Sequence, residues 1–234
     1  MRENTDCFLA YGGESAARCL VAQLGCEGAV GRIRLLCPAG REERVEGAAA
    51  MGVGGLLSAE TLRAVAESAE APYTLLGFRP TPLTLGPYAV ERLAAAATMS
   101  GAAMVYADFL TEKGGTTARH PLIDYQEGSL RDDFDFGPLV LLRSELLKAW
   151  AQEWDTEGRT DPRSAGWYAP RPLLTRHREL LHLDEPLYTE HEPEDPTRDG
   201  ERQFDYVDPR NREAQQEMEC VVSRHLRLVG ALVD

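Results

Sequence analysis

The first 110 residues alternate short apolar runs with alanine-rich stretches of helical spacing, and this alternation limits the possible folds more than any other feature of the sequence. The apolar runs predict strands at 6–10, 32–37, 73–78 and 104–110. Helices are predicted between them at 15–24, 59–69 and 88–99. Right-handed crossovers between such strands give a parallel sheet covered by helices. The sequence therefore predicts an α/β fold with a mostly parallel sheet sandwiched by helices.

The predicted sheet also indicates where a ligand would bind. Open sheets of this kind bind ligands at the carboxyl ends of their strands, so the loops after Ala10, Phe78 and Leu110 are the candidate region. Two helix starts are marked as well. Ser58 is a suitable N-cap for the second helix, and Pro87 is expected at the first helical position of the third, where its missing N–H costs least.

The pattern changes beyond Leu110. A Gly114–Gly115 turn within 112–120 predicts a hairpin. A strand is expected at 138–143 with an amphipathic helix after it, and two short strands at 180–183 and 186–190. Residues 192–208 are acidic and rich in proline, which favours a surface excursion.

The chain is expected to end in an amphipathic helix. Asp208 and Pro209 form an N-cap with proline at the first helical position. The apolar stripe of this helix consists of Ala214, Met218, Val221, Val222, His225 and Val229. We expect a domain at 1–202 and a helical extension at 203–234 that packs on it or on a following domain. The apolar run at the very end suggests a part of a longer protein.

The charge of the chain excludes some partners. Lys and Arg number 25 against 38 Asp and Glu, a net charge of 25 − 38 = −13. Nucleic acid and anionic lipid both need a basic contact surface, so neither is an expected partner. The amino terminus carries only a brief apolar run, so no signal peptide or transmembrane segment is expected. We expect a cytoplasmic protein whose five cysteines, which form no C-x-x-C pair, are buried free thiols.

Motif searches find no established catalytic signature. The chain has no phosphate-binding P-loop, no H-E-x-x-H and no G-x-S-x-G. The five histidines lack the spacing of metal ligands, and a structural or surface role is favoured for each. Gly12 and Gly13 follow the first strand, where any tight strand-to-helix turn uses glycine as readily as a phosphate loop does.

A family resemblance is carried by the order of elements and by several longer phrases. The order includes PYTLLGFRPTPL at 72–83, FDFGPLVLLRSELLKAW at 134–150, AGWYAPRPLLTR at 165–176 and LHLDEPLYTE at 181–190. It resembles the GT-A domain of family-two inverting glycosyltransferases. HPLIDYQEGSLRDDFDFG at 120–137 and FDYVDPRNREAQQEME at 204–219 resemble a bacterial branch in which such a domain precedes a second glycosyltransferase domain. The resemblance covers nearly the whole chain.

Two departures from the family pattern concern its acidic sites. The family holds Mn²⁺ or Mg²⁺ with a D-x-D motif, but this chain has Phe78, Arg79 and Pro80 at that place. The family's catalytic base lies in a segment that here reads GWYAPRP, with Ala169 or its neighbours at the acidic position. An inverting transfer needs a carboxylate to take the proton of the acceptor hydroxyl. The resemblance thus implies a GT-A scaffold without its two defining acidic sites.

Other residues are candidates to replace these sites. Arg79 is a candidate to offset a diphosphate, or else a solvated loop arginine. Three carboxylates, Asp132, Asp133 and Asp135, are candidates for a base or a metal site, and Arg131 beside them favours a set of loop salt bridges instead. The candidate donor-binding residues are Ala10, Tyr11, Gly12, Arg79 and Asp108. Asp108 is also suited to cap the turn into the hairpin.

Three functions follow as hypotheses. The first is a glycosyltransferase domain in polysaccharide synthesis, with a UDP- or GDP-linked sugar as donor and a saccharide as acceptor. The second is a non-catalytic GT-A-like module that supports a partner catalytic domain in the same protein. The third is a nucleotidyltransferase, which would need a basic residue in the glycine loop, whereas Arg18 falls inside the predicted helix.

Overall fold

The protein is an α/β structure built on one large sheet. The computed structural model describes residues 4–126, 128–131, 133–155, 162–191 and 212–232. The large sheet has seven strands in the order β10-β6-β9-β4-β1-β2-β3. Its strands are β1 (Thr5–Ala10), β2 (Val30–Pro38), β3 (Ala49–Val53), β4 (Tyr73–Gly77), β6 (Met104–Ala107), β9 (Leu139–Arg143) and β10 (Leu180–Leu183). All neighbours pair in parallel except β9, which is antiparallel to both β4 and β6.

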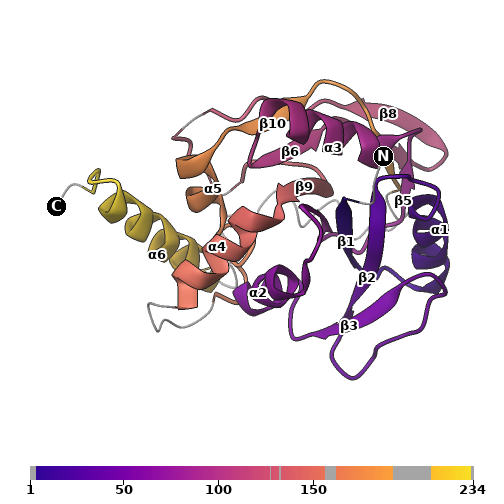
Figure 1. Cartoon of the computed structure of the whole chain (residues 1–234), viewed down its shortest axis with the longest axis horizontal. Helices are drawn as coiled ribbons and strands as arrows, with labels where there is room; N and C mark the ends of the chain where they lie inside the picture. The colour runs from indigo at the N-terminus through magenta and orange to yellow at the C-terminus, as the bar shows by residue number, and fades with distance from the viewer. Residues whose placement is uncertain (1–3, 127, 132, 156–161, 192–211, 233–234) are drawn as a thin grey trace.

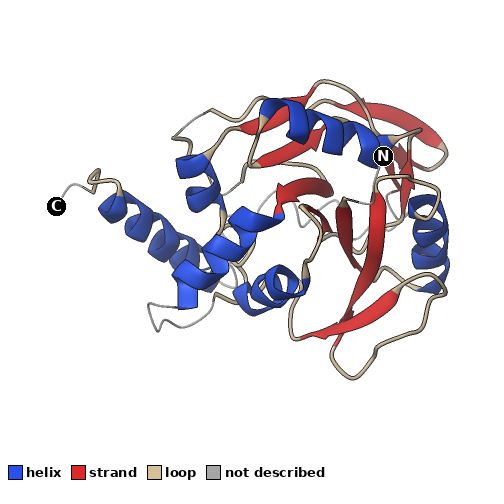
Figure 2. Ribbon diagram, viewed as in Figure 1, coloured by secondary structure: helices blue, strands red, loops and turns tan. Residues whose placement is uncertain are grey.

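Helices cover both faces of this sheet (Figure 1, Figure 2). They are α1 (Glu14–Leu24), α2 (Ala59–Ser68), α3 (Ala89–Ser100), α4 (Ser144–Asp155), α5 (Arg171–His177) and α6 (Arg212–Leu228). In Figure 2, α1 and α3 lie on one side of the sheet and α2 and α4 on the other. Every residue of β4 and of β6 is buried, as expected of strands covered on both faces. The predicted α/β fold with a mostly parallel sheet is confirmed.

A second sheet lies beside the first. It has four strands in the order β5-β11-β7-β8, comprising β5 (Leu83–Leu85), β7 (Phe109–Lys113), β8 (Thr116–His120) and β11 (Tyr188–His191). β7 and β8 pair antiparallel around Gly114 and Gly115, which confirms the predicted hairpin. The strand predicted at 104–110 is divided at Asp108, so β6 belongs to the large sheet and β7 to the small one.

Some local expectations were wrong or incomplete. Ser58 caps α2 as predicted, because its side chain accepts a hydrogen bond from the N–H of Thr61. Pro87 does not begin α3, however. The N-cap is Tyr88 in the left-handed region at φ 58°, and N–H groups of the first turn donate to the carboxylate of Glu27, in the loop after α1. The predicted cap at Asp208 and Pro209 lies outside the described residues.

The cysteine expectation holds for two residues and fails for three. All five thiols are free, with Cys7 and Cys37 buried. Cys19, Cys26 and Cys220 lie on exposed helix or loop surface, because the apolar stretches around them turn their other faces to the core. No helix in the described part of the chain is long and apolar enough to cross a bilayer.

Candidate functional site

A cleft opens beyond the carboxyl end of β4, the edge at which the sequence places a ligand. Its volume is about 650 Å³. Four chain segments line it, at 55–57, 78–80, 134–137 and 163–167. The lining combines the aromatic rings of Phe78, Phe134, Phe136 and Trp167 with the polar side chains of Arg79, Asp135, Arg163 and Ser164. A few polar groups among aromatic walls are typical of a site for a small organic ligand.

Arg79 is bound to two carboxylates at this cleft. One guanidinium nitrogen lies 2.9 Å from Asp135 and the other lies 3.2 Å from Glu190 of β11. Glu190 is buried and also accepts a hydrogen bond of 2.8 Å from the Thr81 hydroxyl. Asp135 accepts from the N–H of Gly137 at 2.9 Å and contacts His120 at 3.2 Å. Arg79 and Asp135, proposed separately from the sequence, therefore form one ion pair.

Phe78, the residue after β4, packs on Trp167 of the GWYAPRP segment. Their ring centroids lie 4.3 Å apart, so the residue after β4 packs directly on the GWYAPRP segment. Trp167 also meets Phe136 edge to face at 6.5 Å. The guanidinium of Arg171, in the same segment, lies over the rings of Phe136 and Tyr168 at 4.9 and 4.7 Å. The residue after β4 and the GWYAPRP segment are thus joined by aromatic packing.

The residues at this place do not fit a divalent cation. Mn²⁺ and Mg²⁺ need several oxygen ligands that converge on one point. Between Asp135 and Glu190 lies the guanidinium of Arg79, which only donates hydrogen bonds and already carries a positive charge. Across the described residues, no group of three or more His, Cys, Asp or Glu side chains is arranged to hold a metal.

The loop after β1 borders a different cavity. Tyr11, next to the strand end at Ala10, donates from its hydroxyl to Glu43, and this contact raises the pKa of Tyr11 to about 12. Gly12 touches the loop after β4, since a Cβ there would lie 2.5 Å from the carbonyl oxygen of Pro80. Gly12 lines a cavity of about 500 Å³ with the start of α1 and residues 82–84. Ala10, Tyr11 and Gly12 are therefore not among the residues that line the Arg79 cleft.

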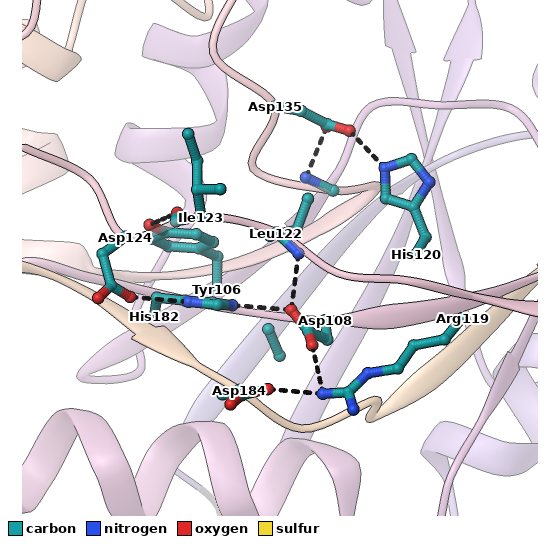
Figure 3. Close-up of polar contacts among 12 residues, drawn as sticks. Tyr106, Asp108, Arg119, His120, Leu122, Ile123, Asp124, Asp135, His182 and Asp184 are labelled. Atoms are coloured by element: carbon teal, nitrogen blue, oxygen red, sulfur yellow. Dashed lines mark hydrogen bonds and ion pairs between the residues drawn. The ribbon is translucent and has the colours of Figure 1, made fainter.

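Asp108 is the centre of a buried polar cluster (Figure 3). It accepts hydrogen bonds from the N–H of Leu122 at 2.8 Å, from Arg119 at 2.8 Å and from His182 at 2.9 Å. Burial by itself would raise the pKa of the Asp108 carboxyl, but these donors outweigh it and lower its pKa below the ordinary value. These contacts join the end of β6 to β8, to the loop after it and to β10.

His182 connects this cluster to a further carboxylate. In Figure 3 its ring lies between Asp108 and Asp124, each 2.9 Å from one ring nitrogen. Carboxylates only accept, so both contacts are hydrogen bonds when both ring nitrogens carry a proton. The ring also stacks on Tyr106 with centroids 5.0 Å apart. His182 thus has the structural role that its lack of ligand spacing favoured.

Asp133, a further acidic candidate, does not line the cleft. Asp133 forms a two-bonded ion pair with Arg131 at 2.8 and 2.7 Å, which lowers its pKa. This is the loop salt bridge that the sequence offered as the alternative. Asp132 lies outside the described residues. Arg18 pairs with Glu14 on α1, so it does not supply the basic loop residue of a nucleotidyltransferase.

Sequence reasoning missed several residues around the cleft, namely Trp167, Arg163, Ser164, Glu190 and His120. One signal was available for Trp167, because it lies in the GWYAPRP segment that departs from the family pattern. Glu190 and His120 carried no such signal, since they come from strands whose pairing with the cleft loops is a property of the tertiary fold.

Solved structures share this architecture. One match is the structure of residues 1–349 of S. aureus TarS, a GT-A-type glycosyltransferase, in complex with UDP-GlcNAc. The TM-score is 0.56 at 11% identity, over 83% of this chain and 60% of that one. The chain has the GT-A fold. TarS 1–349 with UDP matches at 0.53 and 10% identity, over 82% of this chain and 61% of that chain.

In these neighbours, the region that matches this chain is only part of a longer protein. A larger TarS structure matches with a TM-score of 0.53 and 10% identity, over 97% of this chain and 43% of that chain. The chain thus spans about 60% of the length of TarS 1–349. No protein-family model and no curated protein sequence matches the chain.

Proposed function

We propose that this chain is the GT-A domain of a glycosyltransferase that binds a nucleotide-diphospho-sugar without a divalent metal. The observation that carries the proposal is the cleft at the carboxyl end of β4, where Arg79 and Asp135 face one another among aromatic rings. The shared fold with TarS, which was solved with UDP-GlcNAc and with UDP, supports a uridine-linked donor. A GDP-linked sugar remains the other donor class to test.

The charges around the cleft suit a ligand with an anionic part and an uncharged part. Arg79 and Arg163 line the cleft and can face a diphosphate, while Asp135 and Ser164 can accept or donate to sugar hydroxyls. Trp167 and Phe134, both partly exposed, offer apolar faces to a sugar ring. Asp135 and Glu190 partly neutralise the positive charge of Arg79. A diphosphate therefore needs a second cation, and we propose that Arg163 supplies it.

Transfer, where it occurs, uses Asp135 as the base. The acceptor hydroxyl oxygen forms a bond to the anomeric carbon, and its proton passes to the Asp135 carboxylate. The bond from the anomeric carbon to the diphosphate oxygen breaks, and the nucleoside diphosphate leaves with the electron pair. We further propose polysaccharide synthesis in the cytoplasm as the setting, with a saccharide as acceptor.

A second function is favoured by one specific observation. Phe78 and Trp167 pack on one another, and Asp135 is already bound by Arg79, Gly137 and His120. An acceptor hydroxyl would have to displace one of these partners to reach the carboxylate. This arrangement suits a non-catalytic module that supports a second, catalytic glycosyltransferase domain.

Turnover measurements with Asp135→Asn separate the two functions. Release of UDP from UDP-GlcNAc is followed with a mixture of saccharide acceptors, for the wild-type chain and the variant. A glycosyltransferase releases UDP, and the variant loses at least about a hundredfold in rate because the base is removed. Asp133→Asn, outside the cleft, is the matched control and keeps the rate. Binding of UDP-GlcNAc without release in any form would favour the non-catalytic module.

A further inference from the structure

One wall of the cleft is held from outside by the C-terminal helix. The carboxylate of Glu217 on α6 accepts three backbone hydrogen bonds from consecutive residues. The donors are the N–H groups of Arg163 at 3.0 Å, Ser164 at 2.8 Å and Ala165 at 3.0 Å. Charge-assisted hydrogen bonds of this kind are about twice as strong as neutral ones. A single side chain of α6 thus fixes the backbone of the segment at 163–165.

This segment carries three residues of the cleft. Arg163, Ser164 and Trp167 all line it, and Trp167 is the residue that packs on Phe78. None of these side chains belongs to a helix or strand, so their positions depend on the contacts of the segment itself. Glu217 holds the backbone of this segment, and the position of that backbone determines where the side chains of Arg163 and Trp167 lie.

The inner side of the segment is fixed against the loop before α2. The N–H of Ala59 donates to Pro162 at 2.9 Å, and the N–H of Gly166 donates to Leu57 at 2.8 Å. Gly166 lies so close to this loop that a Cβ would be 2.2 Å from the carbonyl carbon of Ser58. The segment is therefore clamped between the 57–59 loop on one side and Glu217 on the other.

The helix α6 is itself anchored close to Glu217. Val221 and Arg224 are buried, and Arg224 reaches Glu153 of α4 at 2.9 Å and lies over the ring of Trp154 at 5.3 Å. Further along, Leu228 and Val229 are exposed, and Figure 1 shows the C-terminal end of the helix projecting from the body. Glu217 thus lies about one turn before Val221 and two turns before Arg224, next to the part of α6 that is packed on the body.

From these contacts we infer that Glu217 is a positioning residue for the cleft, and that α6 belongs to the binding site. Glu217 is not among the residues that line the cleft. It acts by holding the backbone that presents Arg163 and Trp167. Where the cleft binds a nucleotide sugar, which rests on the proposed function, affinity depends on a helix that the sequence would assign to a separate extension.

The test compares the full chain with Glu217→Gln, and uses Glu219→Gln, an exposed carboxylate on the same helix, as the matched control. Amide hydrogen exchange is measured at residues 163–165, together with the affinity for UDP-GlcNAc. We expect Glu217→Gln to speed exchange of these three amides at least about tenfold and to weaken UDP-GlcNAc binding about tenfold, with β1 and β4 amides unchanged. Glu219→Gln should change neither quantity.

Unchanged exchange at 163–165 in a folded Glu217→Gln variant would overturn the inference. If that variant does not fold, Arg224→Ala replaces it, because loosening α6 from Trp154 should also speed exchange at 163–165, and an unchanged rate contradicts the inference. Absence of UDP-GlcNAc binding by the wild-type chain would count against the proposed function alone, since the exchange measurement still decides the role of Glu217.

Discussion

Buried Asp108 shows how one carboxylate can join two sheets. It stands where β6 ends and β7 begins, and its three donors come from β8, from the loop after it and from β10. Because these donors lower its pKa, the ionised form stabilises the folded state above the unfolded pKa of about 4. That contribution is lost as the pH falls through the lowered folded pKa.

We expect Asp108→Asn to reduce the free energy of unfolding by about 3 kcal/mol at neutral pH, because it removes the charge of a buried carboxylate that accepts three hydrogen bonds. The difference from the wild-type chain should shrink as the pH falls below about 4 and through the lowered folded pKa. Urea unfolding across this range measures it. The control is Asp184→Asn. The Asp184 carboxylate contacts the same Arg119 but is 84% exposed, so this change should lower the free energy of unfolding by less than about 1 kcal/mol. A difference that does not depend on pH would contradict this account of Asp108.

Gly166 permits the close approach of the cleft wall to the loop before α2. A Cβ at this position would lie between 2.2 and 2.4 Å from three backbone atoms of residues 57–59, and backbone cannot move aside cheaply. We expect Gly166→Ala to cost about 3 kcal/mol in unfolding free energy. Gly55→Ala, in the opposing loop with its nearest atom at 3.9 Å, should be close to neutral in the same urea titration. Equal effects of the two changes would show that the contact is not close.

At the scale of elements, α3 begins under strain. Tyr88 has a positive φ of 58°, a backbone conformation that costs a non-glycine residue about 1 kcal/mol. Its side chain is exposed. Asparagine tolerates this conformation better, so Tyr88→Asn should stabilise the chain by about 1 kcal/mol. Met99→Asn, at an exposed position within α3, should instead destabilise it by a few tenths of a kcal/mol. Thermal unfolding of both variants measures the difference, and a destabilised Tyr88→Asn would contradict the strain.

Sequence periodicity predicted the elements that have buried, apolar faces. β4, β6 and β9 are continuous apolar runs, and α2 and α4 carry clear stripes. It missed β3, β5 and α5 for physical reasons. β3 is an edge strand of small residues, β5 has three residues between prolines, and α5 begins with an Arg-Pro pair. Each of these forms because a neighbouring element pairs or packs with it.

The candidate site was predictable only in part. The edge of the sheet followed from strand order, Arg79 from its place after a predicted strand, and Asp135 from the carboxylate cluster around it. The pairing of Arg79 with Glu190 joins residues separated by 111 positions, and the contact of Glu217 with the 163–165 segment joins α6 to the cleft. No local pattern encodes such contacts, because they arise where loops from distant elements meet.

For the whole molecule, a net charge of −13 does not by itself prevent an anionic ligand from binding, because the ligand meets only the charges that line the cleft. Arg79, the candidate to offset a diphosphate, is paired with Asp135 and Glu190. Arg163, which sequence reasoning did not consider, lines the cleft. The local balance at the cleft, rather than the total charge, determines which ligand can bind.

Calorimetric titration of the full chain with UDP-GlcNAc and with a GDP-linked sugar, in Mn²⁺ and in EDTA, tests the central claim most directly. Arg79 stands between the carboxylates at the place of the family's metal, so the account predicts binding of a nucleotide sugar with the same affinity in both buffers. Arg163→Met should weaken that binding about tenfold. Binding that requires Mn²⁺, or no heat with either donor, would contradict a metal-independent nucleotide-sugar site.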